Sequence, residues 1–158
     1  MTRRSLLHWL FAAGLPSYAV AADGAAPKIE PLVLPDAEWK KRLTNEQYLV
    51  LRKHGTERAG TSALNDEKRR GRYLCAGCDL PLFGSEMKFD SGTGWPSFFT
   101  AYPGALGTST DFKLIYPRTE YHCARCEGHH GHVFNDGPAP TGKRYCNNGV
   151  ALKFEAMS

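Results

Sequence analysis

The sequence has no dense run of basic residues and no apolar run long enough to cross a membrane as a helix. Its formal net charge of +4 is too small to indicate a nucleic-acid or anionic-membrane partner. The strongest basic cluster, Lys68-Arg69-Arg70 with Arg72, is typical of a solvated loop. The segment from Leu6 to Leu15 offers about ten apolar residues, whereas a membrane-spanning helix needs about 20. We therefore expect neither stable membrane insertion nor binding of nucleic acid.

Residues 1–21 have the pattern of an export signal. Arg3 and Arg4 precede the apolar stretch, and Ala19-Val20-Ala21 supplies the small residues of a cleavage site. The paired arginines favour the twin-arginine route, and a general secretory signal is the alternative. We expect cleavage after Ala21 and a periplasmic protein.

The next part of the chain is predicted to be a linker followed by short helices. Residues 22–35 are rich in Ala and Pro. A first helix should cover 37–43 with Asp36 as its cap. Thr44 should open a second helix, because Gln47 follows three residues later as in a capping box.

The remainder of the domain, which we expect over 36–157, is predicted to be mainly β. After residue 54 the sequence has no long amphipathic period, and Gly, Thr, Ser and Pro separate short apolar runs. Residues 112–116 and 150–154 have the composition of strands. A mainly antiparallel β domain with short N-terminal helices follows.

The five cysteines sort into two pairs and a remainder. Cys75 and Cys78 form one Cys-x-x-Cys motif, and Cys123 and Cys126 form a second. Four thiolates complete the tetrahedral coordination of one zinc ion and leave no position open for a substrate. We therefore predict one structural Zn²⁺, and Cys146 remains as the thiol free to react.

The surroundings of Cys146 indicate a nucleophile. A strand through Arg144, Cys146 and Asn148 would place the three side chains on one face, because alternate residues share a side. Arg144 could then stabilise the thiolate, which is the nucleophilic form, and Asn148 could donate from its amide. The alternative is a buried structural cysteine beside a surface arginine.

His129 and His132 form a second candidate cluster within a glycine-rich segment. Histidine transfers protons near neutral pH, so both are candidate catalytic residues, and His130 is expected to be a bystander. The alternative is a second metal site, because three close histidines can bind zinc or copper, although the sequence leaves no carboxylate or thiol over nearby to complete it.

The segment 88–99 combines glycines with aromatic side chains. Trp95 and Phe98 could form the walls of a small apolar cavity that binds a substrate. The alternative is plain core packing at a corner of a sheet.

Five motifs follow one another along the chain: Cys75-x-x-Cys78, Lys88-Phe89-Asp90-Ser91-Gly92-x-Gly94-Trp95-Pro96-Ser97-Phe98, Cys123-x-x-Cys126, Gly131-His132-Val133-Phe134-x-Asp136-Gly137-Pro138 and Pro140-Thr141-Gly142-x-Arg144-Tyr145-Cys146. In this order they closely resemble the methionine-R-sulfoxide reductase family of the B type. The resemblance covers roughly residues 36–155.

The resemblance implies two antiparallel sheets in a sandwich-like, tent-shaped arrangement with a few peripheral helices. It also implies the reduction of methionine R-sulfoxide residues in oxidised proteins. Cys146 aligns with the nucleophile of the family, and the four paired cysteines align with its zinc ligands. The aligned pocket positions are Trp95, His129, His132, Arg144 and Asn148.

Three departures from the family pattern bear on the mechanism. Some members carry a second cysteine that resolves the sulfenic acid of the nucleophile, and this sequence has Thr93 there. We therefore expect an external, thioredoxin-like thiol reductant, and a protein that acts as a monomer. His130 and Asn147 replace apolar residues, and alternation predicts that Asn147 points away from the face of Cys146.

Two other functions compete with this interpretation. A zinc-ribbon binding module would share the cysteine pairs but would leave Cys146, His132 and Trp95 unexplained. A thiol–disulfide oxidoreductase would use a Cys-x-x-Cys pair and bind no zinc, but such a motif belongs in a βαβ context, which the sequence does not indicate.

Overall fold

The computed structural model describes residues 29–113 and 116–157, so the expected export signal over 1–21 lies outside the described residues. None of the described helices is long and apolar enough to cross a membrane. The elements in chain order are α1 (Asp36–Arg42), α2 (Asn45–Lys53), η1 (Ala63–Asn65), β1 (Gly71–Cys75), β2 (Pro81–Gly84), η2 (Ser85–Met87), β3 (Lys88–Phe89), β4 (Ser97–Phe98), β5 (Leu106–Asp111), β6 (Arg118–Cys123), β7 (His129–Phe134), β8 (Arg144–Asn147), η3 (Gly149–Ala151) and β9 (Leu152–Ala156).

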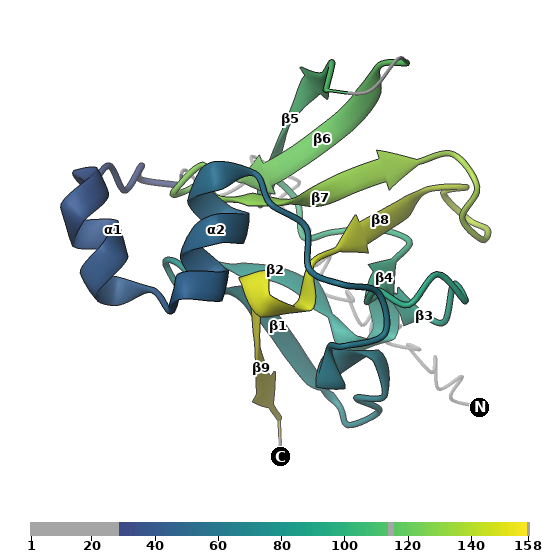
Figure 1. Ribbon diagram of the computed structural model, residues 1–158. Coiled ribbons are helices and arrows are strands. Elements are labelled where there is room, and N and C mark those ends of the chain that lie inside the picture. The colour runs from purple at the N-terminus through teal and green to yellow at the C-terminus, as the bar shows by residue number, and fades with distance from the viewer. Residues whose placement is uncertain (1–28, 114–115, 158) are drawn as a thin grey trace, which may run out of the picture.

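The strands form two antiparallel sheets, which confirms the predicted fold class (Figure 1). One sheet has three strands in the order β2-β1-β9, and the other has six in the order β3-β4-β8-β7-β6-β5. The helix α2 packs against β7 and η3 at one side of the six-stranded sheet. No described strand pair is parallel, so the described chain has no βαβ unit of the thioredoxin type.

The two N-terminal helices begin close to where the sequence predicts. The capping box is confirmed, because Thr44 Oγ1 accepts the N–H of Gln47 and the Gln47 side chain accepts the N–H of Thr44. Asp36, however, is the first residue of α1 rather than its cap, and Pro35 is the N-cap. The Asp36 carboxylate instead accepts a 2.6 Å hydrogen bond from the Tyr48 hydroxyl and so ties α1 to α2.

Residues 29–35, expected to belong to a linker, pack on the domain. Leu32 and Leu34 lie against the hydrophobic core. The Leu32 N–H donates to the Arg125 carbonyl oxygen at 2.7 Å, next to the turn between β6 and β7. The segment therefore covers one edge of the cysteine motifs.

The strand expected over 112–116 is wrong in its described part. β5 ends at Asp111, and Phe112 and Tyr116 are 76% and 63% exposed. The Asp111 carboxylate accepts the N–H of Lys113 at 2.9 Å, and such a side-chain turn takes a donor away from the strand ladder. The strand expected over 150–154 is present as β9, preceded by the short helix η3.

Aromatic side chains fill the space between the two sheets. Phe83 of β2 stacks on Phe98 of β4 with ring centroids 4.1 Å apart, and Tyr73 of β1 meets Phe98 edge-on at 4.9 Å. All three are fully buried, and each such side chain contributes about 1.5–3 kcal/mol to folding. Because Phe98 faces this core, its neighbour Ser97 faces the opposite side of the six-stranded sheet.

Candidate active site

One row of side chains crosses the six-stranded sheet and contains the unpaired thiol. Ser97, Cys146, His132, Glu120 and Ser109 are successive cross-strand partners on β4, β8, β7, β6 and β5. Directly opposed residues of antiparallel strands share a face and have Cβ atoms about 4.5–5.5 Å apart. The strand register therefore sets His132 directly beside Cys146.

A close approach of β7 to β8 maintains this row. Gly131 lies opposite Asn147, and a side chain at Gly131 would overlap the carbonyl oxygen of Cys146. Glycine is therefore required for the two strands to pair at this point.

The His132 ring is held in place by the charged carboxylate of Asp111. Asp111 Oδ2 lies 2.7 Å from His132 Nε2 and accepts a 2.7 Å hydrogen bond from Arg118. The backbone N–H of Lys113 and then His132 and Arg118 hold the pKa of Asp111 well below its usual range. The carboxylate is therefore charged and orients the imidazole through Nε2, which leaves Nδ1 for other partners.

A cavity of about 130 Å³ opens over Cys146. A cavity of this volume can hold one side chain of a bound polypeptide but is too small for a folded domain. The residues that line it come from the 55–62 segment, the Gly-Trp-Pro segment, β6, β7 and β8: Thr56, Trp95, Arg118, Gly131, His132, Phe134, Cys146, Asn147 and Asn148.

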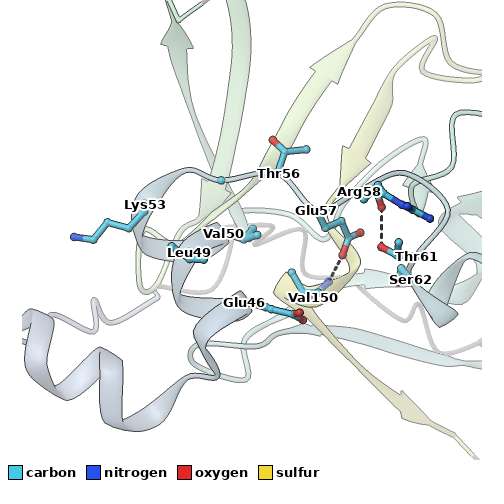
Figure 2. Close-up of a pocket in the computed structure, with 11 residues that line it drawn as sticks. Glu46, Leu49, Val50, Lys53, Thr56, Glu57, Arg58, Thr61, Ser62 and Val150 are labelled. Atoms are coloured by element: carbon cyan, nitrogen blue, oxygen red, sulfur yellow. Dashed lines mark hydrogen bonds between the residues drawn. The ribbon is translucent and has the colours of Figure 1, made fainter.

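A larger groove of about 660 Å³ lies between α2, the 55–62 segment and η3 (Figure 2). No cysteine or histidine lines it, so we assign the reactive chemistry to the smaller cavity. Thr56 lines both, and the groove therefore reaches the rim of the Cys146 cavity. Glu57, at the groove wall, accepts the N–H of Val150 at 3.0 Å.

Burial opposes ionisation of the Cys146 thiol. It raises the pKa of Cys146, and the positive charge of Arg144 and a hydrogen bond from Thr93 offset this only in part. Arg144 acts in the direction expected from the sequence, but its guanidinium is bound by both carboxylate oxygens of Asp136, at 2.9 and 2.8 Å, and stacks on Phe134. The resting thiol is therefore protonated at neutral pH.

The two aromatic residues predicted to line the cavity lie in different places. Trp95 lines it and donates from Nε1 to the Glu57 carbonyl oxygen at 3.2 Å. Phe98 does not line it, because strand alternation turns Phe98 into the core on the other side of β4. Phe134 of β7 is the second aromatic residue of the cavity.

The structure separates His129 from the cavity. His129 is buried, and its Nδ1 lies 2.7 Å from Glu120 Oε1, while its ring lies 5.6 Å from that of His132. Burial lowers the pKa of His129, against the opposing effect of the Glu120 charge. The same contact and the nearby His54 keep the pKa of Glu120 low, although burial raises it.

Asn148 lines the cavity but follows the end of β8, so it does not continue the strand as expected. Its amide accepts the N–H of Glu57 and donates to the His130 carbonyl oxygen, both at 2.9 Å. Asn148 therefore positions the 55–62 segment over the thiol.

His130 and Asn147, two of the three departures from the family pattern, belong to one polar cluster beneath the cavity, which Asn147 also helps to line. The Asn147 side chain turns away from the Cys146 face and accepts a 2.8 Å hydrogen bond from Tyr121. His130 stacks on Tyr121, and its Nε2 lies 3.4 Å from Cys75 Sγ. Burial lowers the pKa of His130 to about 3, so the ring is neutral.

The four paired cysteines meet at the junction of the two sheets. Cys75 ends β1 and Cys78 lies in the β1–β2 turn, while Cys123 ends β6 and Cys126 lies in the β6–β7 turn. All four are buried and free of disulfides. The turns share one geometry, because the residue after each motif, Asp79 or Glu127, is left-handed with φ near 60° and donates its N–H to the first cysteine's carbonyl.

This cluster fits a tetrahedral metal ion. Its sulfur atoms lie within 4.8 Å of one another, and two of their separations are 3.6 and 3.5 Å. An ion with metal–sulfur bonds of about 2.3 Å separates its ligands by about 3.8 Å. Hydrogen bonds among the thiols lower the pKa of Cys78 and Cys126 and raise that of Cys75 and Cys123. A bound cation would favour the thiolate form of all four cysteines and replace these hydrogen bonds.

Several residues of the site carry no signal in the sequence. Asp111, Arg118 and Glu120 reach the cavity or its histidines only because β5, β6 and β7 pair in one register. Thr56 and Glu57 belong to an irregular segment with no recognisable motif. The signal that could have identified Phe134 was its place in the Gly-His-Val-Phe motif, two residues after His132 and so on the same face.

Residues 43–156 match the SelR domain family. Over 133 residues the chain is 53% identical to peptide methionine sulfoxide reductase B1, chloroplastic, of Arabidopsis thaliana, covering 84% of this chain and 66% of that protein. It is 50% identical over 137 residues to peptide methionine sulfoxide reductase MsrB of Agrobacterium fabrum, covering 86% of this chain and 99% of the relative. Among solved structures, the Mis18 Yippee-like domain aligns with 57% of this chain and 99% of its own, at a TM-score of 0.44 and 15% identity, too distant to bear on function.

The ion pair of Arg144 makes the Cys146 pKa sensitive to Asp136. Asp136→Asn removes a negative charge that raises the pKa of Cys146 and frees the guanidinium. The pKa of the thiol should therefore fall, by less than about one pH unit, as measured by the pH dependence of alkylation. Glu38→Gln, a change in the exposed helix α1, should leave it unchanged, and a higher pKa in Asp136→Asn would contradict this electrostatic account.

Proposed function

Since the chain belongs to the SelR family of B-type peptide methionine sulfoxide reductases, we propose that it reduces methionine R-sulfoxide residues in oxidised proteins, with Cys146 as the nucleophile. The protein is thus an oxidoreductase that repairs oxidised methionine. The support from its own residues is the pairing of Cys146 with His132 across β7 and β8 inside a side-chain-sized cavity.

Cys146 carries the chemistry because the other four cysteines of the chain form the buried cluster. Its raised pKa calls for a base, and His132 is the adjacent titratable group. With Nε2 held by Asp111, His132 takes the thiol proton on Nδ1. The charged Asp111 stabilises the imidazolium that results.

The reaction then moves one oxygen atom and two electrons. The Cys146 thiolate attacks the sulfoxide sulfur while His132 returns the proton to the sulfoxide oxygen, so that a sulfur–sulfur bond joins Cys146 to the protonated sulfoxide. Transfer of the hydroxyl group to the Cys146 sulfur then breaks this sulfur–sulfur bond. Methionine leaves with its sulfur reduced by two electrons, and Cys146 keeps the oxygen as sulfenic acid, oxidised by two electrons. Two equivalents of an external thiol restore the Cys146 thiol and yield one disulfide and one water.

Selection of one epimer follows from a fixed cavity with unlike walls. Trp95 and Phe134 offer apolar surface to the substrate methyl group, whereas His132 and Arg118 offer donors to the sulfoxide oxygen. Exchanging methyl and oxygen would set the oxygen against the aromatic rings and leave the donors unpaired. The groove that begins at Thr56 offers room for polypeptide on one side of the oxidised methionine.

An external reductant is proposed because no second thiol reaches the cavity. Thr93 occupies the position of the resolving cysteine and lies close enough to Cys146 to lower the pKa of its thiol. A thioredoxin-like protein is the proposed donor. We also propose that the protein acts as a monomer in the periplasm after export.

The proposed ion of the cysteine cluster is one Zn²⁺ held by Cys75, Cys78, Cys123 and Cys126. Zinc bound by four thiolates has no open position, so its contribution is to folding and not to the reaction.

The experiment that tests the function is single-turnover reduction of separate R and S epimers of a peptide methionine sulfoxide. The wild-type protein should reduce the R epimer alone, and Cys146→Ser should reduce neither. Retained activity in Cys146→Ser, or equal use of both epimers, would refute the assignment of Cys146 or of the stereochemistry.

Thr93→Cys tests the need for an external thiol. Because Thr93 lies close enough to Cys146 to affect the pKa of its thiol, this variant should end a single turnover with an internal disulfide and no free sulfenic acid, as detected by mass spectrometry. The matched control Thr108→Cys, on the exposed edge strand β5, should keep the sulfenic acid. Sulfenic acid in both variants would show that position 93 cannot resolve Cys146.

Cys75→Ser tests the structural role of the metal. Loss of one ligand should abolish stoichiometric metal binding and lower Tm by at least about 10 °C, because binding energy at such a site is folding energy. Metal analysis and thermal unfolding measure both effects. Cys146→Ser is the control that should retain metal and Tm, and an unchanged Tm in Cys75→Ser would contradict the role.

A further inference from the structure

A second group of metal-binding side chains lies outside the cysteine cluster and the Cys146 cavity. His54 Nδ1 lies 2.9 Å, and His129 Nδ1 lies 2.7 Å, from the same carboxylate oxygen, Glu120 Oε1. The three ligand atoms all lie within 4.8 Å of one another. Two imidazoles and a carboxylate thus meet at a single point.

The three side chains come from separate elements. His54 is the left-handed residue that ends α2, with φ of 54°, whereas Glu120 lies within β6 and His129 begins β7. The other Glu120 oxygen accepts a 3.4 Å hydrogen bond from Ser109, which steadies the carboxylate. The group therefore joins the end of a helix to two strands of the sheet.

We propose that His54, Glu120 and His129 form a second metal site for a divalent transition-metal ion of the zinc class, with its fourth position open to water. The sequence suggests a metal site formed by three close histidines, His129, His130 and His132. The site proposed here keeps His129 but contains His54 and Glu120 instead of His130 and His132. His130 points to the cysteine cluster, and His132 is bound to Asp111.

The donor set and its spacing suit such an ion. Two histidines and one carboxylate with an open position are the ligands of many exchangeable or catalytic zinc sites. An ion with bonds of about 2.0–2.1 Å in tetrahedral geometry separates its ligand atoms by about 3.4 Å. The nitrogen–oxygen separations of 2.9 and 2.7 Å must therefore widen by about 0.5 and 0.7 Å, and the half-exposed His54 side chain has space to adjust.

The surroundings favour binding of a cation that exchanges with solvent. Glu120 supplies a buried negative charge, while His129 is buried beside it. The His54 side chain is 47% exposed, so an ion can enter from that side. The nearby cationic side chains bind groups other than Glu120. Arg118 binds Asp111, and the Lys113 ammonium donates to the His54 carbonyl oxygen at 3.3 Å.

The test is a metal titration of the untagged full chain with its cysteine cluster already loaded and with no sulfoxide substrate present. Equilibrium dialysis against Co²⁺ or Zn²⁺ should give one additional ion per chain. The additional Co²⁺ should show ligand-field absorption without the thiolate-to-cobalt charge-transfer bands of a cysteine site. One ion per chain in total, or charge-transfer bands from the second ion, would overturn the proposal.

The variant His54→Asn separates a built site from adventitious binding. Asparagine tolerates the left-handed backbone, so the fold should persist, while the affinity for the second ion should fall at least about tenfold. His122→Asn is the matched control, because the His122 ring lies over Gly107 and not at Glu120; it should retain the second ion. Equal binding by His54→Asn and wild type, or equal loss in both variants, would overturn the site.

A further variant and an activity control complete the design. Glu120→Gln should also lose the second ion while keeping the first. Reductase activity of His54→Asn in the presence of a weak chelator should equal that of the wild type, because His54 does not touch the cavity. The metal result is therefore independent of the proposed reaction, and either can fail without the other.

Discussion

The contact on which the rest of the structure depends is the meeting of two turns at four cysteine sulfurs. One turn belongs to the three-stranded sheet and the other to the six-stranded sheet. The β6–β7 turn that carries Cys123 and Cys126 also sets where β7 begins. Since His132 lies on β7 and Cys146 on β8, the position of that turn governs whether these two side chains face each other.

A buried polar cluster connects these cysteines to the reactive strand. His130 contacts Cys75 Sγ at 3.4 Å and stacks on Tyr121, whose hydroxyl binds the Asn147 side chain next to Cys146. Two of the three departures from the family pattern, His130 and Asn147, thus lie in one cluster.

The sequence predicts those features that depend on local spacing. The two Cys-x-x-Cys turns, the capping box at Thr44 and the placement of Arg144 beside Cys146 are all set by residues close in the chain. Contacts that depend on the register of distant strands cannot be predicted in this way. The contact between Asp111 and His132 joins residues 21 positions apart, and no local sequence pattern predicts it. For the same reason Phe98 could not be assigned to the core, nor His129 to Glu120, before the strand pairing was known.

The main electrostatic difference between expectation and structure concerns the pKa of Cys146, and burial accounts for it. Adjacent charge from Arg144 suggests a lowered thiol pKa, but the enclosed position of Cys146 and the pairing of Arg144 with Asp136 outweigh it. The Cys146 thiol is therefore neutral at rest, which residue types alone do not reveal.

The most direct test of this account is to identify the oxidised sulfur after one turnover. The protein would be mixed with one equivalent of a peptide methionine R-sulfoxide without any reducing thiol, treated with a sulfenic-acid-specific reagent and mapped by mass spectrometry. The account predicts one modification per chain, at Cys146 alone, in step with the methionine formed. Methionine formed without modification of Cys146, or modification of the cluster cysteines, would contradict it.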